Sequence, residues 1–573
     1  MVRQLAPYTK KYLLYMILAP ISVIFEVLLE IRIPYYMSKI VDVGIGTGDM
    51  DYVLRTGGMM VLMALLGLCF GATSSRFASM AGMGFGSELR RGLFEKVQSF
   101  SFANVDKFST ASLITRLTTD VQTIQMAFMM TIRMLVRAPV MLVGATIMAV
   151  QINGELALIF LVAIPVLAGL LALIAVKAYP QFRKMLDRYD NLNASVQENL
   201  IAIRVVKAFA RSEFEKGKFK DANDALTAAQ RKAERILNWN MPVMQLTVYS
   251  CIVAILWFGG QKIVVGNMQT GELISFVSYV NQILMSLMMI ANVFVNLVMS
   301  RASLQRISDV LAEEPDIRDG SGEAQAADGS IDFENVSFKY NKDASEKVLE
   351  GVNLHIASGQ MVGIIGGTGS AKSTLVQLIP RLYDVSEGRV LVGGRDVREY
   401  KIADLRQAVG MVLQKNVLFS GTIRDNLKWG DGAASDEEIT AAARAAQADD
   451  FVQSFPDGYD TDLGQGGVNV SGGQKQRLCI ARALLKKPKI LILDDSTSAV
   501  DTATDARIRQ AFATDLAGTT KIIIAQRITS VCDCDQIIVM DGGKIAAVGT
   551  HDQLMETSDI YRDVYESQQK GVA

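Results

Sequence analysis

A glycine-rich turn in the second half of the chain has the residue order of a phosphate-binding loop. It follows an apolar run, residues 361–365, and leads into a helical run that starts with Lys372 and Ser373. In such a loop, backbone N–H groups and the helix N-terminus hold phosphate oxygens, the lysine reaches the terminal phosphates, and the hydroxyl binds Mg²⁺. The residues that predict this nucleotide site are Gly366, Gly367, Thr368, Gly369, Ser370, Ala371, Lys372, Ser373 and Thr374.

One residue of this loop departs from the consensus, which has glycine directly before the lysine. The chain has Ala371 at that position. If Ala371 takes helical φ and ψ, its methyl group costs little.

A second group of polar residues lies between residues 470 and 501. It begins with the turn Ser471, Gly472, Gly473, Gln474, whose glycines and following helix start favour anion binding. It then reaches an apolar strand, residues 490–493, which ends at two adjacent carboxylates, Asp494 and Asp495.

The order of these segments resembles that of ATP-binding cassette (ABC) proteins. By this resemblance, the Ser-Gly-Gly-Gln turn is the signature motif, which caps the γ-phosphate of ATP bound by the opposite cassette. Asp494 corresponds to the Walker B carboxylate that holds Mg²⁺ through water. Gln414 corresponds to the Q-loop glutamine, which contacts Mg²⁺ and the attacking water. Tyr340 stands where the family stacks an aromatic ring on adenine, and Ser498 to Asp501 correspond to the D-loop.

Two residues of the same nucleotide site depart from the family pattern. Asp495 replaces the general-base glutamate, and Gln526 replaces the switch histidine. The shorter side chain withdraws the carboxylate by about 1 Å, and a misplacement of that size can lower a rate about a hundredfold. Glutamine can hydrogen-bond a phosphate but cannot carry a proton as histidine can. A weaker departure is Gln465, where exporters commonly have glutamate.

These departures imply a slow nucleotide site beside an intact signature motif. In this family, each site combines the P-loop, Walker B and switch residues of one chain with the signature motif of the other. The chain resembles one subunit of bacterial heterodimeric multidrug ABC exporters, which have the type IV ABC transporter fold. That resemblance implies ATP-driven export of small amphipathic molecules, drug-like or lipid-like, with a second ABC half-transporter as partner and most hydrolysis at the partner's site.

The first half of the chain is strongly apolar. Half of the 573 residues are hydrophobic, and the mean hydropathy is +0.24. A helix needs about 20 residues to span a bilayer. The apolar stretches that predict six membrane-spanning helices are residues 12–37, 56–76, 137–153, 156–177, 238–262 and 273–300.

Two long segments, between the second and third spans and between the fourth and fifth, are rich in lysine and arginine. The positive-inside rule places them, and both termini, in the cytoplasm. Helical periodicity continues through these segments, so we expect long helical extensions. The resemblance implies a bacterial inner-membrane protein. The resemblance assigns coupling helices, which touch nucleotide-binding domains, to their tips near residues 103–108 and 209–214.

The sixth expected span has a polar row on one helical face. Its spacings of 4, 3, 4, 3 and 4 keep the residues on one side. Asn and Gln can join neighbouring helices, or they can line a translocation pathway in which Met adapts to varied apolar shapes. Both interpretations stay open for the row, which is Ser278, Gln282, Met285, Met289, Asn292 and Asn296.

Three ionisable residues, Glu26, Glu30 and Arg32, interrupt the first span. The two carboxylates lie one helical turn apart, and carboxylates at such depth face a cavity or a partner. If they line the pathway, they favour cationic substrates. The alternative is an ion pair with Arg32 or with an arginine of another helix.

Composition limits the other partners. The net charge of -1 and the pI near 6.3 argue against a nucleic-acid binder. The five cysteines have no disulfide framework spacing and are expected to be reduced thiols.

The expected architecture is an α-helical transmembrane domain fused to an α/β P-loop cassette. Residues 1–312 form the six-span domain with its two coupling-helix excursions, residues 313–329 a linker, and residues 330–573 the nucleotide-binding domain, with ATP and Mg²⁺ as cofactors. Three alternatives remain: a homodimeric exporter with two slow sites, an importer or lipid translocator on the same fold, and an ATP-gated membrane protein that does not pump.

Overall fold

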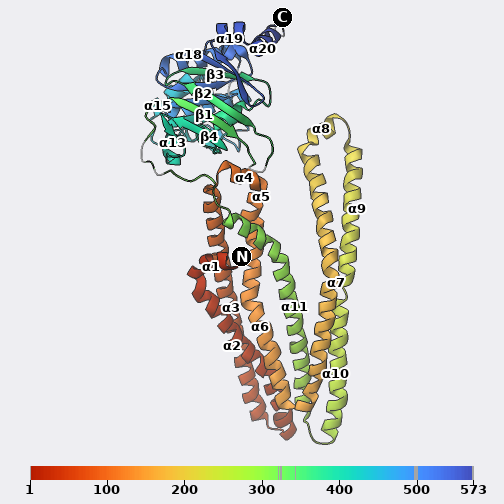
Figure 1. Ribbon diagram of the computed structural model, residues 1–573. Helices are drawn as coiled ribbons and strands as arrows, with labels where there is room; N and C mark the ends of the chain where they lie inside the picture. Colours follow the sequence, from red (N-terminus) through yellow and green to blue (C-terminus); the bar gives the residue numbers. More distant parts are fainter. Residues whose placement is uncertain (1, 321, 323–324, 342–343, 496–500, 571–573) are drawn as a thin grey trace. The chain divides into compact units, whose positions relative to one another are not determined.

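The computed structural model describes residues 2–320, 322, 325–341, 344–495 and 501–570. The chain divides into two compact units, drawn in Figure 1. The helical unit is Met1–Gln98 with Ser109–Glu313, and the α/β unit is Ser99–Phe108 with Glu314–Ala573. Ser99–Phe108, the tip of the first excursion, therefore groups with the α/β unit, although the residues before and after it belong to the helical unit.

Among its described residues, the helical unit contains six helical segments that are long and apolar enough to cross a membrane. They run for 42 to 53 residues, about twice what a bilayer requires. The expectations of six spans and of long helical extensions are therefore confirmed. The segments are Gln4–Ile45, Met50–Gln98, Thr110–Ile152, Gly154–Ile201, Ser212–Val264 and Thr270–Ala312.

The individual elements follow the chain with short interruptions. In order they are α1 (Val2–Thr9), η1 (Lys10–Tyr12), α2 (Leu13–Lys39), η2 (Ile40–Ile45), α3 (Met50–Gln98), α4 (Phe102–Phe108), α5 (Thr110–Thr115), η3 (Arg116–Asp120), α6 (Val121–Ile152), α7 (Gly154–Ile201), α8 (Ile203–Ala208), α9 (Ser212–Leu237), α10 (Asn240–Val264) and α11 (Thr270–Ala312).

Helices α2, α6 and α11 pack together through a buried apolar cluster that also takes in parts of α7 and α10. The buried Tyr279 hydroxyl of α11 donates to the backbone oxygen of Ile31 in α2 at 2.9 Å. Near the other end of α11, Arg306 forms an ion pair with the buried carboxylate of Asp120. These contacts fix which face of α11 is turned toward α2 and α6.

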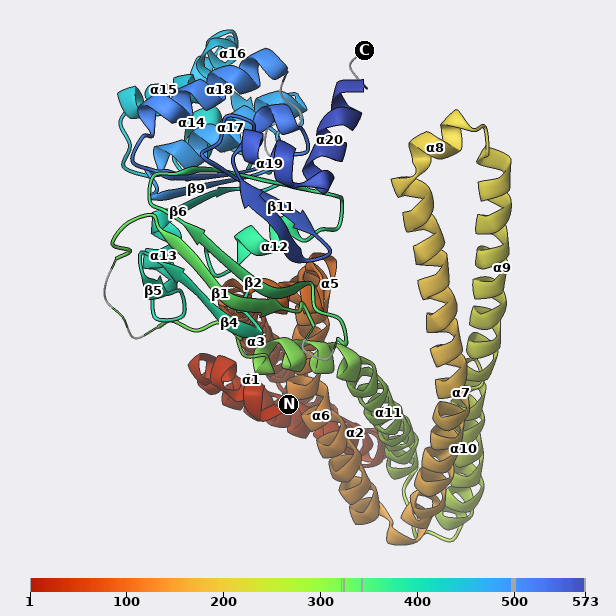
Figure 2. The ribbon, with the colours of Figure 1, turned by 45° about the horizontal axis from the view of Figure 1, so that its top comes forward.

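Helix α9 continues end to end into α10, both run beside α7, and the short helix α8 joins the far ends of α7 and α9 (Figure 2). The sequence placed this tip at residues 209–214. The structure instead ends the short helix at Ala208, and α9 begins at Ser212. Phe209 is 74% exposed and Phe214 is 64% exposed.

The α/β unit is built on two main sheets. The strand order is β2-β1-β4-β5 in an antiparallel sheet and β12-β11-β3-β10-β9-β6 in the larger one, where only β12 runs antiparallel. The strands are β1 (Ile331–Phe338), β2 (Leu349–Ile356), β3 (Met361–Gly366), β4 (Glu387–Val392), β5 (Arg395–Asp396), β6 (Val409–Val412), β7 (Gly421–Thr422), β8 (Asp462–Leu463), β9 (Ile490–Asp494), β10 (Thr520–Ile524), β11 (Gln536–Asp541) and β12 (Lys544–Gly549).

The larger sheet is covered on both faces, as a parallel sheet must be. In β9, Leu491 and Leu493 enter one apolar cluster while Ile490 and Ile492 enter the other. The helices of this unit are α12 (Lys372–Gln377), α13 (Ile402–Ala408), α14 (Ile423–Leu427), α15 (Asp436–Ala445), α16 (Asp449–Gln453), η4 (Gly458–Asp460), α17 (Gly472–Leu485), α18 (Thr502–Asp515), η5 (Ile528–Ser530), α19 (His551–Thr557) and α20 (Asp559–Lys570).

Candidate functional site

Three neighbouring parallel strands bring the predicted nucleotide residues to one edge of the larger sheet. Ile524 of β10 pairs with Ile364 of β3 on one side and with Asp494 of β9 on the other. Because the carboxyl ends of parallel strands meet at one edge, the loops after β3, β9 and β10 lie together there. Segments more than 100 residues apart thus meet at this edge, called here the nucleotide edge.

The glycine-rich loop lies between β3 and α12, as the sequence predicts. The Lys372 ammonium donates hydrogen bonds to the backbone oxygens of Gly366 and Gly367, each at 2.8 Å. Burial lowers the pKa of Lys372, while the carboxylates of Asp495 and Asp494 oppose that change. The ammonium therefore lies within the loop, among backbone groups that can hold phosphate.

Ala371 does not have the helical conformation under which its methyl group would cost little. Its φ is 69° and its ψ is 22°, in the left-handed region. A side chain in this region costs about 1–2 kcal/mol, which is the physical reason for glycine in the consensus. The methyl group packs against the apolar cluster that contains Leu375 and Val376. This packing opposes the backbone strain, and the loop keeps its shape.

Ser373 and Asp494 form the oxygen-rich part of the edge. The Ser373 hydroxyl donates to Asp494 Oδ1 at 2.9 Å. Asp494 is only 2% exposed, and this burial raises its pKa above the usual carboxyl value. A hydroxyl and a carboxylate held together are the hard oxygen ligands that Mg²⁺ takes beside nucleotide phosphates, so the residues present fit that ion.

Asp495 and Gln526, the two substituted residues, are in direct contact. The Gln526 side-chain amide donates to Asp495 Oδ2 at 2.7 Å. The Asp495 N–H donates to the Ile524 oxygen at 3.0 Å, and the Asp495 carbonyl accepts from Gln476 at 3.3 Å. The backbone of Asp495 is therefore held through both its N–H and its carbonyl, and one carboxylate oxygen is engaged by the Gln526 amide.

Gln568 of the C-terminal helix α20 holds the backbone around Gln526. Its amide nitrogen donates to the Gln526 oxygen at 2.7 Å, and its amide oxygen accepts from the Ile528 N–H at 2.9 Å. The sequence analysis missed this residue, because no motif surrounds it and α20 returns to the edge only in the folded chain.

The signature residues form a helix start rather than part of the nucleotide edge. Ser471 is the N-cap of α17, and it exchanges hydrogen bonds with Gln474 in a capping box. Ser471 and Gly472 are exposed. The capping box takes up the N–H groups of Ser471 and Gln474, and the exposed Gly472 lies between them in the first turn of the helix, an end that favours anions. Of the predicted D-loop, Ser498 to Val500 lie outside the described residues, and Asp501 caps α18 through the Thr504 N–H at 2.9 Å.

Tyr340 lies beside the glycine-rich loop and is 47% exposed. Its hydroxyl lies 2.9 Å from Thr374 Oγ1, and its ring makes an edge contact with Tyr383 at 5.2 Å between centroids. The Tyr383 hydroxyl donates to Asp106 in α4 at 2.8 Å, and burial together with Asp106 raises the pKa of Tyr383. The sequence analysis missed Tyr383, which joins the candidate adenine residue to the first excursion tip.

Gln414 follows β6 by two residues, and β6 is the neighbour of β9 in the sheet. Its side chain is exposed. Within the described ranges, Gln414 hydrogen-bonds to none of the other residues of the nucleotide edge. Only the pairing of β6 with β9 brings Gln414 toward that edge.

Family models match both halves of the chain: the ABC transporter transmembrane region at residues 16–287 and the ABC transporter model at residues 349–498. An uncharacterized ABC transporter ATP-binding protein of Bacillus subtilis, YfiB, is 38% identical over 98% of this chain and 97% of its own length. The chain belongs to the ABC transporter family. Rv1273c of Mycobacterium tuberculosis, also an uncharacterized ABC transporter ATP-binding protein, is 38% identical over 99% of this chain and 97% of its own.

The structure of a bacterial Atm1-family ABC exporter with ATP bound is similar over nearly the whole transporter. The TM-score is 0.84 at 26% identity, covering 98% of this chain and 99% of that chain. The predicted fold class is therefore confirmed: an exporter-type transmembrane region and an ATP-binding domain are fused in one chain. The transporter is an enzyme that couples ATP hydrolysis to transport.

The polar row of α11 stays off the packed face of the transporter's helical unit. Tyr279, Ile283 and Leu284 are fully buried, whereas Met285 is 52% exposed. The row's Asn296 donates to the Asn292 oxygen of its own helix at 2.9 Å. Within the described residues, no hydrogen bond joins this row to another helix, which weighs against the row as glue between helices of this chain.

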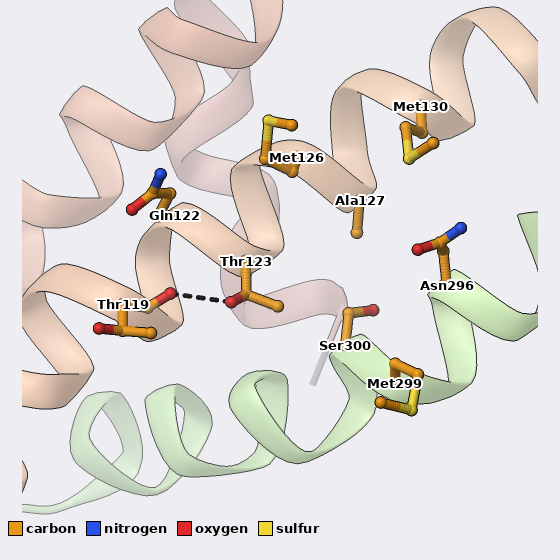
Figure 3. Close-up of a pocket in the computed structure, with 9 residues that line it drawn as sticks. All are labelled: Thr119, Gln122, Thr123, Met126, Ala127, Met130, Asn296, Met299 and Ser300. Atoms are coloured by element: carbon orange, nitrogen blue, oxygen red, sulfur yellow. Dashed lines mark hydrogen bonds between the residues drawn. The ribbon is translucent and has the colours of Figure 1, made fainter. Parts of the chain in front are cut away.

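Two cavities adjoin α6 and α11. The larger, about 350 Å³, is shown in Figure 3. It includes Asn296 of the row, and methionines and short polar side chains line it from both helices: Thr119, Gln122, Thr123, Met126, Ala127, Met130, Asn296, Met299 and Ser300. The second cavity, about 250 Å³, includes Gln282, Met285 and Met289.

Glu26 and Glu30 pair with an arginine of another helix, one of the two alternatives that the sequence left open. Arg137 of α6 forms an ion pair with Glu26, and its other terminal nitrogen lies 2.6 Å from Glu30 Oε2. Arg32 is exposed and lies two residues beyond Glu30 on α2. The guanidinium thus bridges two carboxylates one helical turn apart.

Proposed function

We propose that this chain is one half of a heterodimeric exporter of small amphipathic molecules in a bacterial inner membrane. The glycine-rich loop, Tyr340 and Gln414 bind ATP, and Ser373 with Asp494 holds Mg²⁺. This chain's own site hydrolyses ATP slowly. Its signature residues complete the faster site of a second half-transporter, and both termini and the ATP-binding domain lie in the cytoplasm.

The contact between Asp495 and Gln526 carries the proposal of a slow site. A general base must reach the proton of the attacking water, yet one Asp495 oxygen accepts a hydrogen bond from Gln526 at 2.7 Å. The Gln526 amide cannot take up and release a proton near neutral pH as the missing histidine would. ATP binding needs neither a general base nor a switch histidine. This site therefore keeps its affinity for ATP while its rate of hydrolysis falls.

The signature residues support the need for a different partner chain. Ser471 to Gln474 form a capped helix start with Gly472 exposed in its first turn. An anion at such a place is stabilised by the helix N-terminus. Loss of catalytic residues on one side and retention of the cap on the other is useful only when the partner's own site keeps its base.

The face of α11 supports an amphipathic substrate. Methionine side chains adapt to varied apolar shapes, and amides such as Gln282 and Asn296 offer both donors and acceptors. Both residues line cavities on this face. The similarity to an exporter structure supports export as the direction.

Inactivation of one site at a time tests the proposal. The transporter is purified with the half-transporter encoded beside it, and ATPase is compared for Lys372→Ala here and for the equivalent lysine change in the partner. We expect a small loss for the first and near-total loss for the second. Equal losses contradict the asymmetric model. Robust ATPase and transport by this chain alone support the homodimer instead.

Transport itself is measured with inside-out vesicles. ATP-dependent dye uptake against a gradient is the expected result, because uptake into such vesicles corresponds to export. Its absence, with ATPase intact, supports a membrane protein that does not pump.

A further inference from the structure

The smaller cavity of the helical unit, about 250 Å³, combines apolar and charged walls. Met141 of α6 and Met285 and Met289 of α11 supply sulfur-containing apolar surface, while Glu30 and Arg137 supply charge. A volume of this size accommodates a two-ring aromatic body. The charges decide which head group that body carries.

The charged residues around the cavity leave one carboxylate uncompensated. Arg137 is shared by Glu26 and Glu30, so two negative groups meet one positive group. Arg133, one turn earlier on α6, forms no ion pair with either carboxylate within the part of the chain that the structure describes, and it is not among the residues that line this cavity. Uncompensated charge inside a membrane is costly, which favours a ligand that carries the opposite charge.

The unpaired buried oxygens are hydrogen-bond acceptors. Among the described residues, Glu26 Oε2 and Gln282 Oε1 are buried without a hydrogen-bond donor. Gln282 lines the cavity, and Glu30 reaches it with a side chain that is 41% exposed. Buried acceptors without donors cost free energy, and an N–H-bearing ligand between Glu30 and Gln282 would remove that cost at Gln282.

We propose that this cavity binds an organic ammonium ion with an apolar, two-ring-sized body, Glu30 and Gln282 accepting from its N–H groups and the methionines packing on its rings. This substrate class rests on the proposed function as an exporter. Glu26 acts behind the cavity by holding Arg137, which leaves Glu30 with an oxygen free for the ligand.

Matched naphthalene probes test the charge preference. The full transporter, with its partner, is placed in nanodiscs of uncharged phosphatidylcholine. Dissociation constants for 2-naphthylmethylammonium, 2-naphthylmethanol and 2-naphthoate are measured by naphthyl fluorescence. We expect the ammonium to bind about tenfold tighter than the other two, as for a hydrogen bond to a charged group.

Glu30→Gln then removes the charge while keeping the shape of the side chain. We expect the tenfold preference to fall to about twofold with alcohol binding unchanged, since the alcohol does not use the charge. Gln282→Leu tests the second acceptor without changing any charge, and it should weaken ammonium binding about threefold. Glu155→Gln, which removes a carboxylate paired with Lys262 elsewhere in the helical unit, is the matched control and should keep the full preference.

Three outcomes overturn the inference: no ammonium preference in the unmodified transporter, a preference that survives both Glu30→Gln and Gln282→Leu, or tighter binding of the naphthoate. The last would assign the cavity to anions through Arg137. None of these changes the ATPase asymmetry measured on the same preparation, so failure here is distinct from failure of the proposed function.

Discussion

The two ends of the segment from residue 470 to residue 501 differ in the contacts that hold them: local hydrogen bonds at one end and contacts with distant residues at the other. At the signature end, Ser471 and Gln474 cap their own helix through hydrogen bonds only three residues apart. At the carboxylate end, Asp495 is held by Ile524, Gln526 and Gln476, and through Gln526 by α20. The Ser-Gly-Gly-Gln turn keeps the family residues, whereas the end built by tertiary contacts has Asp495 in place of glutamate, in contact with a second substituted residue, Gln526, outside the segment.

This difference bears on the proposal that a single chain serves two nucleotide sites unequally. A capped helix start needs no other element of its own chain to form. The catalytic base needs a side chain of the right length at the junction of several elements. In the proposed heterodimer, substitutions can therefore slow one site without changing the helix start that would cap the partner's site.

The largest expected effect is at the signature end. Gly473→Asp places a carboxylate where N–H groups are to meet a γ-phosphate, so the partner's site loses its anion cap. We expect the ATPase of the pair to fall about a hundredfold, as for loss of a donor that stabilises a transition-state oxyanion. Gly518→Asp, in a turn where an added Cβ meets nothing within 4 Å, is the control for the same chemical change. Full ATPase with Gly473→Asp would mean that the partner does not use this motif.

The next effect concerns the contact between the two substituted residues. The pair Asp495→Glu and Gln526→His should raise hydrolysis at this chain's own site about tenfold, measured with the partner's general base replaced by glutamine. Each single change should give about twofold or less, because the other residue still lacks the correct length or proton chemistry. Additive single effects would show that the 2.7 Å contact between these side chains does not couple them.

A smaller effect is expected from the anchor on α20. Gln568→Leu removes two hydrogen bonds to the backbone around Gln526, which loosens that loop. We expect bound ATP to leave this chain's site about fivefold faster in a filter-retention assay, the effect of about one net hydrogen bond. Gln569→Leu is the matched control, since Gln569 contacts Tyr565 of its own helix instead. Equal release rates in the two variants would make Gln568 a surface residue without a positioning role.

Much of the fold and of the nucleotide edge could be predicted from the sequence. The glycine-rich loop, the apolar strand before Asp494 and the six apolar spans each have a local pattern, and the structure places them as expected. What the sequence could not predict depends on returning elements. Gln568 reaches the nucleotide edge from the last helix, and Tyr383 reaches Asp106 from the α/β unit.

Two further features could not be predicted because they depend on packing and backbone conformation. The first is the identity of Arg137 as the partner of Glu26 and Glu30. Helical periodicity does not show which helix packs beside α2, so it could not select this arginine. The left-handed backbone of Ala371 could not be read from its residue type, since alanine normally prefers the helical region.

The smallest expected effect is at that strained alanine. Ala371→Gly removes a methyl group from a backbone with a φ of 69°, but glycine also gains freedom in the unfolded chain. The relief of about 1–2 kcal/mol therefore shrinks to about 0.5–1 kcal/mol, and we expect two- to fivefold tighter binding of a non-hydrolysable ATP analogue. Ala442→Gly, in the interior of α15, is the matched substitution and should lower stability by about 1 kcal/mol in thermal unfolding, because its backbone is helical. Weaker nucleotide binding by Ala371→Gly would mean that the methyl group's packing against Leu375 and Val376 outweighs the strain, and the loop would then owe its shape to alanine.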